Sequence, residues 1–218
     1  MTINYQNLNL INKELEVFPR SNLLIVSKNQ SQEDILELIN KGYSKFGENR
    51  VQEASNKFTT SLRKKFNNID LHLIGPLQSN KTRLALNTFD TIQTLDRKKI
   101  ISEISKEIKK NKNIRTSNYF IQVNIGLEEQ KSGVSPDELY NIYEYACSLE
   151  LKIQGIMCIP PNEPNVEKFF IKLKKLRDNL DKNLILSMGM SADYKPALKL
   201  GSNIIRIGSK IFTWDNSF

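Results

Sequence analysis

Short apolar segments typical of buried strands alternate with amphipathic helical segments along most of this 218-residue chain. The first segment, Leu23-Leu24-Ile25-Val26, is apolar at four consecutive positions. Such a run indicates a strand buried on both faces, as in a parallel sheet. Similar segments recur at intervals of roughly 25 residues, which is compatible with one β-α unit each. Strands are therefore predicted at residues 23–28, 43–47, 69–75, 89–95, 118–125, 151–159, 183–188 and 203–208.

Eight β-α units are the number that closes a (β/α)8 barrel of the TIM type. We therefore predict an α/β fold with one domain over residues 1–218, in which the barrel covers about 23–212 and an extra helix precedes it at about 6–17. An open doubly wound sheet is the alternative. That fold usually carries a GxGxxG fingerprint after its first strand, whereas Ser27-Lys28-Asn29-Gln30 stands there in this chain.

Two helix starts are marked by capping residues. Ser31 with Asp34 predicts a capping box, and Ser135-Pro136-Asp137-Glu138 combines a cap, a proline at the first helical position and a glutamate at the third. Pro196 is compatible with a helix only if it lies in the first turn.

The rarer residue types exclude several classes of protein. The two cysteines, Cys147 and Cys158, have no CxxC spacing and the single histidine is His72, so neither a disulfide framework nor a metal site is expected. We expect His72, between apolar neighbours, to be a satisfied barrel residue rather than a catalyst. With no apolar run of membrane-spanning length and no secretory signal, we expect a cytoplasmic protein without a membrane partner.

The net charge of +8 first suggests a nucleic-acid partner, because lysine and arginine neutralise phosphates. Many of the lysines, however, lie among apolar residues at helical spacing, as in segments 106–112 and 168–175. Such lysines are typical of the solvated faces of amphipathic helices. No aromatic residues are grouped with the basic ones, so a nucleic-acid-binding protein ranks last among the functions considered.

Active sites of barrels lie at the carboxyl ends of the strands, and Lys28 stands at the end of the first predicted strand. We expect its amine at the barrel mouth with a buried stem, where it could act as a nucleophile toward an aldehyde. From position alone, an ordinary lysine with its charge extended into solvent is the simpler interpretation.

A second feature follows the last two predicted strands. Loops after strands seven and eight form the usual phosphate site of barrels, and here they carry Ser191, Gly208 and Ser209. We expect residues 210–212 to form a short helix whose amino end faces the anion. The alternative is that these residues are turn glycines and helix caps, with Ser191 capping a helix over residues 192–200.

An amine that can form an imine, opposite a phosphate cradle, suggests pyridoxal 5'-phosphate as the cofactor. Arg206, on the last predicted strand, could contact the pyridine nitrogen of the cofactor, between its aldehyde and its phosphate. Because an arginine keeps its proton, it would leave that nitrogen unprotonated and the ring a poor electron sink.

Eight segments carry a resemblance to a known family: Val26–Lys28, Phe46–Glu53, His72–Lys81, Gln122–Asn124, Lys131–Gly133, Gly155–Met157, Ser187–Asp193 and Arg206–Gly208. In these segments the chain resembles the pyridoxal phosphate homeostasis proteins, which are related in fold to the amino-terminal domain of alanine racemase. The resemblance implies that Lys28 binds the cofactor as a Schiff base, that Ser191, Gly208 and Ser209 hold its phosphate, and that Arg206 contacts the pyridine nitrogen. It also implies that Asn49 and Met157 lie beside the ring. From the residues alone, Asn49 could be a helix cap and Met157 a core residue.

Three positions depart from the pattern of the resembled family. Pro76 stands where many relatives have histidine, Arg50 where many have tyrosine, and Ser209 where threonine is common. Ser209 keeps a hydroxyl, so phosphate binding is still expected, whereas Arg50 and Pro76 could change the mouth of the site.

We therefore expect a monomeric carrier of pyridoxal 5'-phosphate that buffers the cofactor or delivers it to apoenzymes, with no catalytic residues. The alternative is a pyridoxal-dependent enzyme with weak amino-acid racemase activity. The related racemase needs a second domain with an opposing tyrosine, and eight β-α units leave no room for one in 218 residues. Together with the argument from Arg206, this favours cofactor binding over turnover.

Overall fold

The computed structural model describes residues 2–111 and 113–213, and eight parallel strands in it close into a barrel. Each strand pairs in parallel with the next, and the last pairs with the first, which confirms the predicted fold and excludes the open sheet. The predicted strands all form, with ends that differ by a few residues. They are β2 (Asn22–Val26), β3 (Lys45–Glu48), β4 (Asp70–Leu73), β5 (Thr91–Leu95), β6 (Asn118–Val123), β7 (Ile153–Cys158), β8 (Ile185–Met190) and β9 (Ile204–Ile207).

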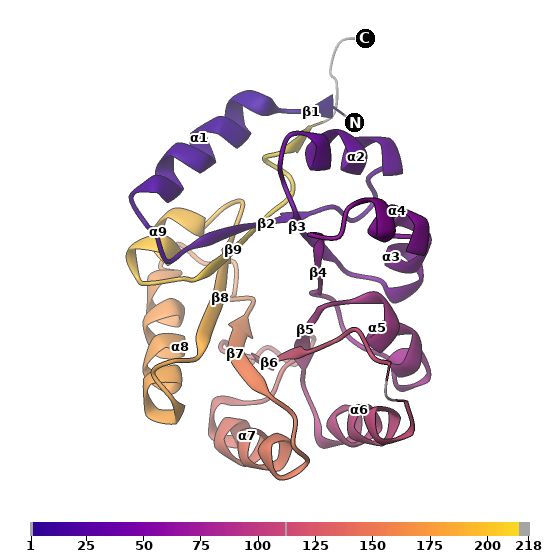
Figure 1. Ribbon diagram of the computed structural model, residues 1–218. Coiled ribbons are helices and arrows are strands. Elements are labelled where there is room, and N and C mark those ends of the chain that lie inside the picture. The colour runs from indigo at the N-terminus through magenta and orange to yellow at the C-terminus, as the bar shows by residue number, and fades with distance from the viewer. Residues whose placement is uncertain (1, 112, 214–218) are drawn as a thin grey trace.

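Helices form an outer ring around these strands (Figure 1). They lie in the connections between successive strands, as expected for right-handed β-α-β units. Two helices, rather than one, connect β3 to β4. The helices are α2 (Gln32–Asn40), α3 (Val51–Lys57), α4 (Thr60–Lys65), α5 (Thr82–Thr88) after the 3-10 turn η1 (Ser79–Lys81), α6 (Lys98–Lys110), α7 (Leu139–Ser148) after the 3-10 turn η2 (Pro136–Glu138), α8 (Glu167–Leu180) and α9 (Tyr194–Lys199).

The predicted extra helix is α1 (Tyr5–Glu16), and it lies in the outer ring between α9 and α2 (Figure 1). Its first residue donates a hydrogen bond from the Tyr5 hydroxyl to Glu37 of α2, at 2.5 Å. Near its other end, Glu14 pairs with Lys195 of α9 at 2.7 Å. Helix α1 therefore covers the part of the barrel that a helix after β9 would otherwise cover.

The prediction of a helix over residues 210–212 is wrong. The amides of Ile211 and Phe212 both donate to the carbonyl of Gly208, which makes a single turn. The chain then enters β10 (Phe212–Thr213), which pairs antiparallel with β1 (Thr2–Ile3) in a small separate sheet. Pairing with the start of the chain extends this segment and leaves no helix there.

The capping predictions are confirmed. The Ser31 hydroxyl accepts from the amide of Asp34, and the Asp34 carboxylate accepts from the amide of Ser31, which completes the capping box of α2. The Ser135 hydroxyl accepts from the amide of Glu138 at the start of η2. Pro196 is the third residue of α9, within the first turn, where its missing N–H costs no helical hydrogen bond.

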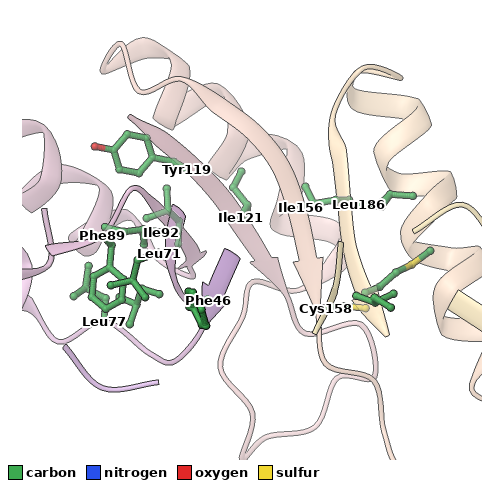
Figure 2. Packing of buried hydrophobic residues seen from close by; sticks show 14 of the residues in the cluster. Phe46, Leu71, Leu77, Phe89, Ile92, Tyr119, Ile121, Ile156, Cys158 and Leu186 are labelled. Atoms are coloured by element: carbon green, nitrogen blue, oxygen red, sulfur yellow. The ribbon is translucent and has the colours of Figure 1, made fainter. Parts of the chain in front are cut away.

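The main hydrophobic core lies between the strands and the surrounding helices. Figure 2 shows Leu71, Leu77, Phe89 and Ile92 gathered in one group. Farther along the barrel, side chains of β6, β7 and β8 continue the same layer. This layer fixes the strands, and so it determines where the residues beyond each carboxyl end are placed.

Three classes of feature are absent from the part of the chain that the structure describes. Cys147 and Cys158 are both free, the first exposed and the second buried. Within residues 2–111 and 113–213, no group of His, Cys, Asp and Glu side chains could hold a metal ion. No helix in the same residues is long and apolar enough to cross a bilayer.

Candidate functional site

Lys28 lies two residues beyond the end of β2, in a turn at the carboxyl ends of the barrel strands. The expectation of a buried stem is wrong, because Lys28 is exposed. The strand ends at Val26, and Lys28 and Asn29 form a turn in which Asn29 lies in the left-handed region at φ 61°. The amine is therefore accessible from solvent rather than enclosed by the barrel.

Lys28 shares a cavity of about 180 Å³ with Gly208 and Ser209. The three residues come together because β9 pairs with β2, so the segments beyond these two strands emerge side by side. Val26 and Phe212 also line the cavity. The amine and two members of the predicted phosphate cradle are thus neighbours, although 180 residues separate Lys28 from Gly208 in the sequence.

Ser191 follows β8, which pairs with β9 so that Met190 lies opposite Arg206. Just before this loop, Gly189 is the next-to-last residue of β8; it has φ +91°, and a Cβ there would lie 2.6 Å from the Cβ of Ala197. The amide of Met190 donates to Asp193 at 2.5 Å. Ser191 is half-buried, does not line the cavity of Lys28, and precedes the helix cap at Asp193 rather than capping α9 itself.

The two loops present free backbone donors. In the described part of the chain, the N–H groups of Ser191, Ala192 and Ser209 have no hydrogen-bond acceptor. Backbone N–H groups that share one corner of a barrel and lack partners are suited to an anion. The missing side chain of Gly208 allows its backbone to lie close to that of Val26 in β2, since a Cβ at this position would lie 3.1 Å from the carbonyl oxygen of Val26.

The turn that carries Lys28 is held by a buried cluster of charged residues. Lys57 donates to the carbonyl of Ser27 at 2.7 Å and to Glu48 at 2.8 Å, and it pairs with Glu53 at 2.7 Å. The amide of Asn29 donates to the same Glu53 oxygen at 2.6 Å. The residues before and after Lys28 are therefore both anchored to this cluster.

The two carboxyl groups of the cluster have pKa values shifted in opposite directions. Burial raises the pKa of Glu48 above its usual value, and the hydrogen bonds from Lys57 and Ser27 offset this only in part. Burial also acts to raise the pKa of Glu53, but Lys57 and the Asn29 amide outweigh it, and the net shift is downward. Because all three N–H bonds of Lys57 are used, Lys57 does not compete with Lys28 as a free amine.

Arg206 is buried and its guanidinium points into the barrel. One terminal nitrogen donates to the Ser187 hydroxyl at 2.9 Å and the other to the carbonyl of Cys158 at 2.7 Å. Burial lowers the pKa of this guanidinium below its usual value. Arg206 does not line the cavity of Lys28, so it lies deeper in the barrel than the amine.

Ser187 continues a chain of hydrogen bonds through the barrel interior. Its hydroxyl donates to Gln93 at 2.6 Å, and Gln93 in turn lies 2.7 Å from Nδ1 of His72. His72 is thus a satisfied barrel residue on that side of its ring, as expected. Met157 is fully buried and pairs in register with Ser187, so it shares the interior face of the barrel with that serine.

Comparison with known proteins agrees with this geometry. The family model described as alanine racemase, N-terminal domain, matches residues 5–214. The pyridoxal phosphate homeostasis protein of Haemophilus influenzae is 38% identical over 224 residues, which cover 94% of this chain and 93% of that protein. The chain belongs to the pyridoxal phosphate homeostasis family.

Solved structures place the family in the same fold. PipY of Synechococcus elongatus, solved without PLP, has a TM-score of 0.85 and 29% identity, and covers 95% of this chain and 99% of its own. The same protein with PLP bound has a TM-score of 0.82 and 28% identity over the same shares. Alanine racemase of Clostridium difficile has a TM-score of 0.75 at 16% identity, and the match covers 99% of this chain and 58% of the racemase. At this identity, the likeness shows a shared fold alone.

Asn49, Arg50 and Pro76, three positions that the family resemblance singled out, lie together in a cavity different from that of Lys28. Asn49 lines a cavity of about 410 Å³ with Arg50 and Pro76, the two departures from the family pattern, and with Lys81. Asn49 is not the cap of α3, because that position is taken by Arg50. Arg50 therefore adds a positive charge, and Pro76 a rigid side chain, to the wall around Asn49.

Sequence reasoning missed the groups that support the site. Glu48 at the end of β3, and Glu53 with Lys57 one helical turn apart on α3, carry a weak signal in the i, i+4 spacing of the last two. Gln93, between β5 residues that are all buried, carries a second signal, because a buried amide needs a polar partner. Which partner it finds depends on strand register.

Proposed function

We propose that this chain binds pyridoxal 5'-phosphate as a Schiff base on Lys28 and serves its homeostasis by buffering the cofactor or delivering it to apoenzymes. One observation carries the proposal: the exposed amine of Lys28 shares a cavity with Gly208 and Ser209. The family and PipY, which has been solved with PLP bound, support the same cofactor.

The residues present fit the two ends of this cofactor. The unpaired amides of Ser191 and Ser209 and their hydroxyls are suited to a phosphate, and Lys28 supplies the amine for an aldehyde. We assign the phosphate to Ser191, Gly208 and Ser209. Arg206 is proposed to contact the pyridine nitrogen, and Asn49 and Met157 are proposed to lie beside the ring.

The cofactor supplies a reactive aldehyde, and the chain supplies the nitrogen that captures it. With the cofactor bound, the amine of Lys28 would capture the aldehyde carbon in a C=N bond, and the aldehyde oxygen would leave with the two amine hydrogens as water. No oxidant or reductant is required. Because Lys28 is exposed, water or another amine can reach this bond, as release to an apoenzyme requires.

Arg206 favours a carrier over an enzyme. A guanidinium held by Ser187 and by the carbonyl of Cys158 cannot act as a proton source for a pyridine nitrogen, since arginine remains protonated in proteins. Without that proton the ring withdraws electrons poorly, and chemistry at a substrate carbon is disfavoured.

Titration of the purified chain with pyridoxal 5'-phosphate, followed by absorbance spectroscopy, tests the proposal. We expect a visible absorption band that saturates at one equivalent and disappears on borohydride reduction. Lys28→Ala should lose the band, whereas Lys81→Ala, which removes an amine lining the cavity of Asn49, should keep it. An undiminished band in Lys28→Ala would contradict the proposal.

A further inference from the structure

A further cavity, of about 490 Å³, lies at the amino-terminal mouth of the barrel, at the opposite end from Lys28. Its volume is within the range of small-molecule sites. Every one of the eight barrel strands contributes to its wall. The contributing strand residues are Asn22, Lys45, Asp70, His72, Thr91, Asn118, Phe120, Gln154, Ile185 and Ile204.

The wall of this cavity carries an excess of positive charge. Arg20, Lys45, Arg177 and Lys182 line it, against the single carboxylate of Asp70. Asp70 is already engaged, at 3.3 Å from Lys45. Arg177 pairs with Asp178 outside the wall at 2.6 Å.

Two of these cations form no close ion pair. Within residues 2–111 and 113–213, no carboxylate lies within 4.0 Å of Arg20 or Lys182. Both side chains belong to exposed residues at the rim. They are therefore free to close on an anion without breaking an ion pair.

His72 forms part of the floor of this cavity. The residue is 4% exposed, and its Nδ1 is used by Gln93. Its Nε2 lies 3.0 Å from an oxygen of Asp70 but has no hydrogen bond of acceptable geometry. This nitrogen therefore shares a poorly aligned contact with Asp70, and the same floor presents the side-chain amides of Asn118 and Gln154, so a bound oxygen atom would find several donors there.

These observations select the class of ligand. Guanidinium and ammonium groups at the rim bind phosphate oxygens, and the recessed floor of polar side chains suits hydroxyl or carbonyl oxygens. A recess bounded by all eight strands admits a small molecule and excludes a polymer. We propose that the amino-terminal mouth of the barrel is a binding site for a small phosphorylated metabolite, distinct from the site at Lys28.

The test uses the fact that His72 is the only histidine in the chain, so its imidazole protons give a single set of NMR signals. Inorganic pyrophosphate would be titrated into the full chain at constant ionic strength and pH. We expect a saturable shift of the His72 signals. The double variant Arg20→Gln/Lys182→Gln should weaken binding about fivefold to tenfold.

Two controls make the result specific. Lys99→Gln/Lys109→Gln removes the same number of charges from exposed positions on α6. This double variant should leave unchanged the pyrophosphate concentration at which the His72 shift is half complete. Ser209→Asp places a carboxylate in the cavity of Lys28 and should also leave the His72 shift unchanged. Because Arg20 and Lys182 are exposed, their variants are expected to fold, which circular dichroism would verify.

Several outcomes would overturn the proposal. They are the absence of a saturable shift, equal midpoints for the two double variants, and loss of the shift in Ser209→Asp, which would place the pyrophosphate at the opposite end. The proposal does not depend on the function proposed for Lys28, since the test is made without pyridoxal 5'-phosphate.

Discussion

The ammonium group of Lys57 lies 2.8 Å from the buried carboxylate of Glu48, and the same ammonium donates to the carbonyl of Ser27, the residue before Lys28. This pair links a barrel strand, a helix and the turn of the proposed cofactor site. Removing Lys57 would leave Glu48 without its cation in a fully buried position.

We predict that Lys57→Met lowers the free energy of unfolding by about 3–5 kcal/mol, the usual result of breaking a buried pair from one side. Urea unfolding at neutral pH measures this. Lys64→Met, at an exposed position on α4, is the matched control and should change stability by less than about 0.5 kcal/mol. Glu48→Gln/Lys57→Met should recover part of the loss; a double variant as unstable as Lys57→Met would contradict this account.

Asp70 predicts a dependence of stability on pH. Burial acts to raise its pKa, but His72 and Lys45 outweigh burial and lower the pKa to about 2. The pKa of this carboxyl is therefore lower in the folded protein than in the unfolded chain, where it is about 3.8. The ionised carboxylate stabilises the folded protein fully at pH values above 3.8, and this stabilisation is lost as the pH falls toward 2.

Asp70→Asn should therefore cost about 1–2 kcal/mol at pH 7, allowing for the partial exposure of Asp70, and about half of that at pH 3. Urea unfolding of both proteins across this range gives the difference at each pH. A difference that is constant between pH 7 and pH 3 would show that the carboxylate charge is not responsible.

Gly189 and Gly201 form a natural comparison, because both have φ +91° but only one is crowded. A Cβ at Gly189 would lie 2.6 Å from Ala197, whereas a Cβ at Gly201 would meet nothing within 4 Å. Gly201→Ala should cost about 1–2 kcal/mol from backbone strain alone. Gly189→Ala should cost more, about 2–4 kcal/mol, because overpacking adds to strain.

Because Gly189 shapes the loop of Ser191, Gly189→Ala should also weaken pyridoxal 5'-phosphate binding, while Gly201→Ala should not. Thermal unfolding and an absorbance titration measure the two effects separately. Equal losses of stability and affinity in both variants would mean that the crowding at Gly189 has no role in the site.

The two cysteines should differ in reactivity. Burial raises the pKa of the Cys158 thiol to about 12, and Cys158 is fully enclosed, whereas Cys147 is exposed. A thiol reagent at pH 8 should therefore modify one cysteine in the folded chain and the second only after unfolding. Rapid modification of two thiols in the native protein would contradict the described burial.

Much of the fold and part of the site followed from the sequence, because both depend on local patterns. Apolar runs and caps located the strands and helices. The sequence also placed Lys28, Gly208 and Ser209 at the carboxyl ends of the strands, and the structure brings them together because the first and last strands of the closed barrel are neighbours.

The rest depended on contacts that no local pattern contains. The bond from Ser187 to Gln93 joins residues 94 positions apart, and it exists only in this register of the strands. The exposure of Lys28 depends on β2 ending at Val26, and the extended backbone at Phe212 depends on pairing with Ile3. The first and last of these features are decided by a partner distant in the sequence.

The most direct test of the central claim is to load the chain with pyridoxal 5'-phosphate, reduce it with borohydride and map the modified peptide by mass spectrometry. We predict a phosphopyridoxyl mass on Lys28 and none on the peptides of Lys57, Lys81 or Lys131. A label on Lys81 or Lys131 with Lys28 unmodified, and equal labelling of Lys28→Ala, would contradict the assignment of Lys28 as the residue that binds the cofactor.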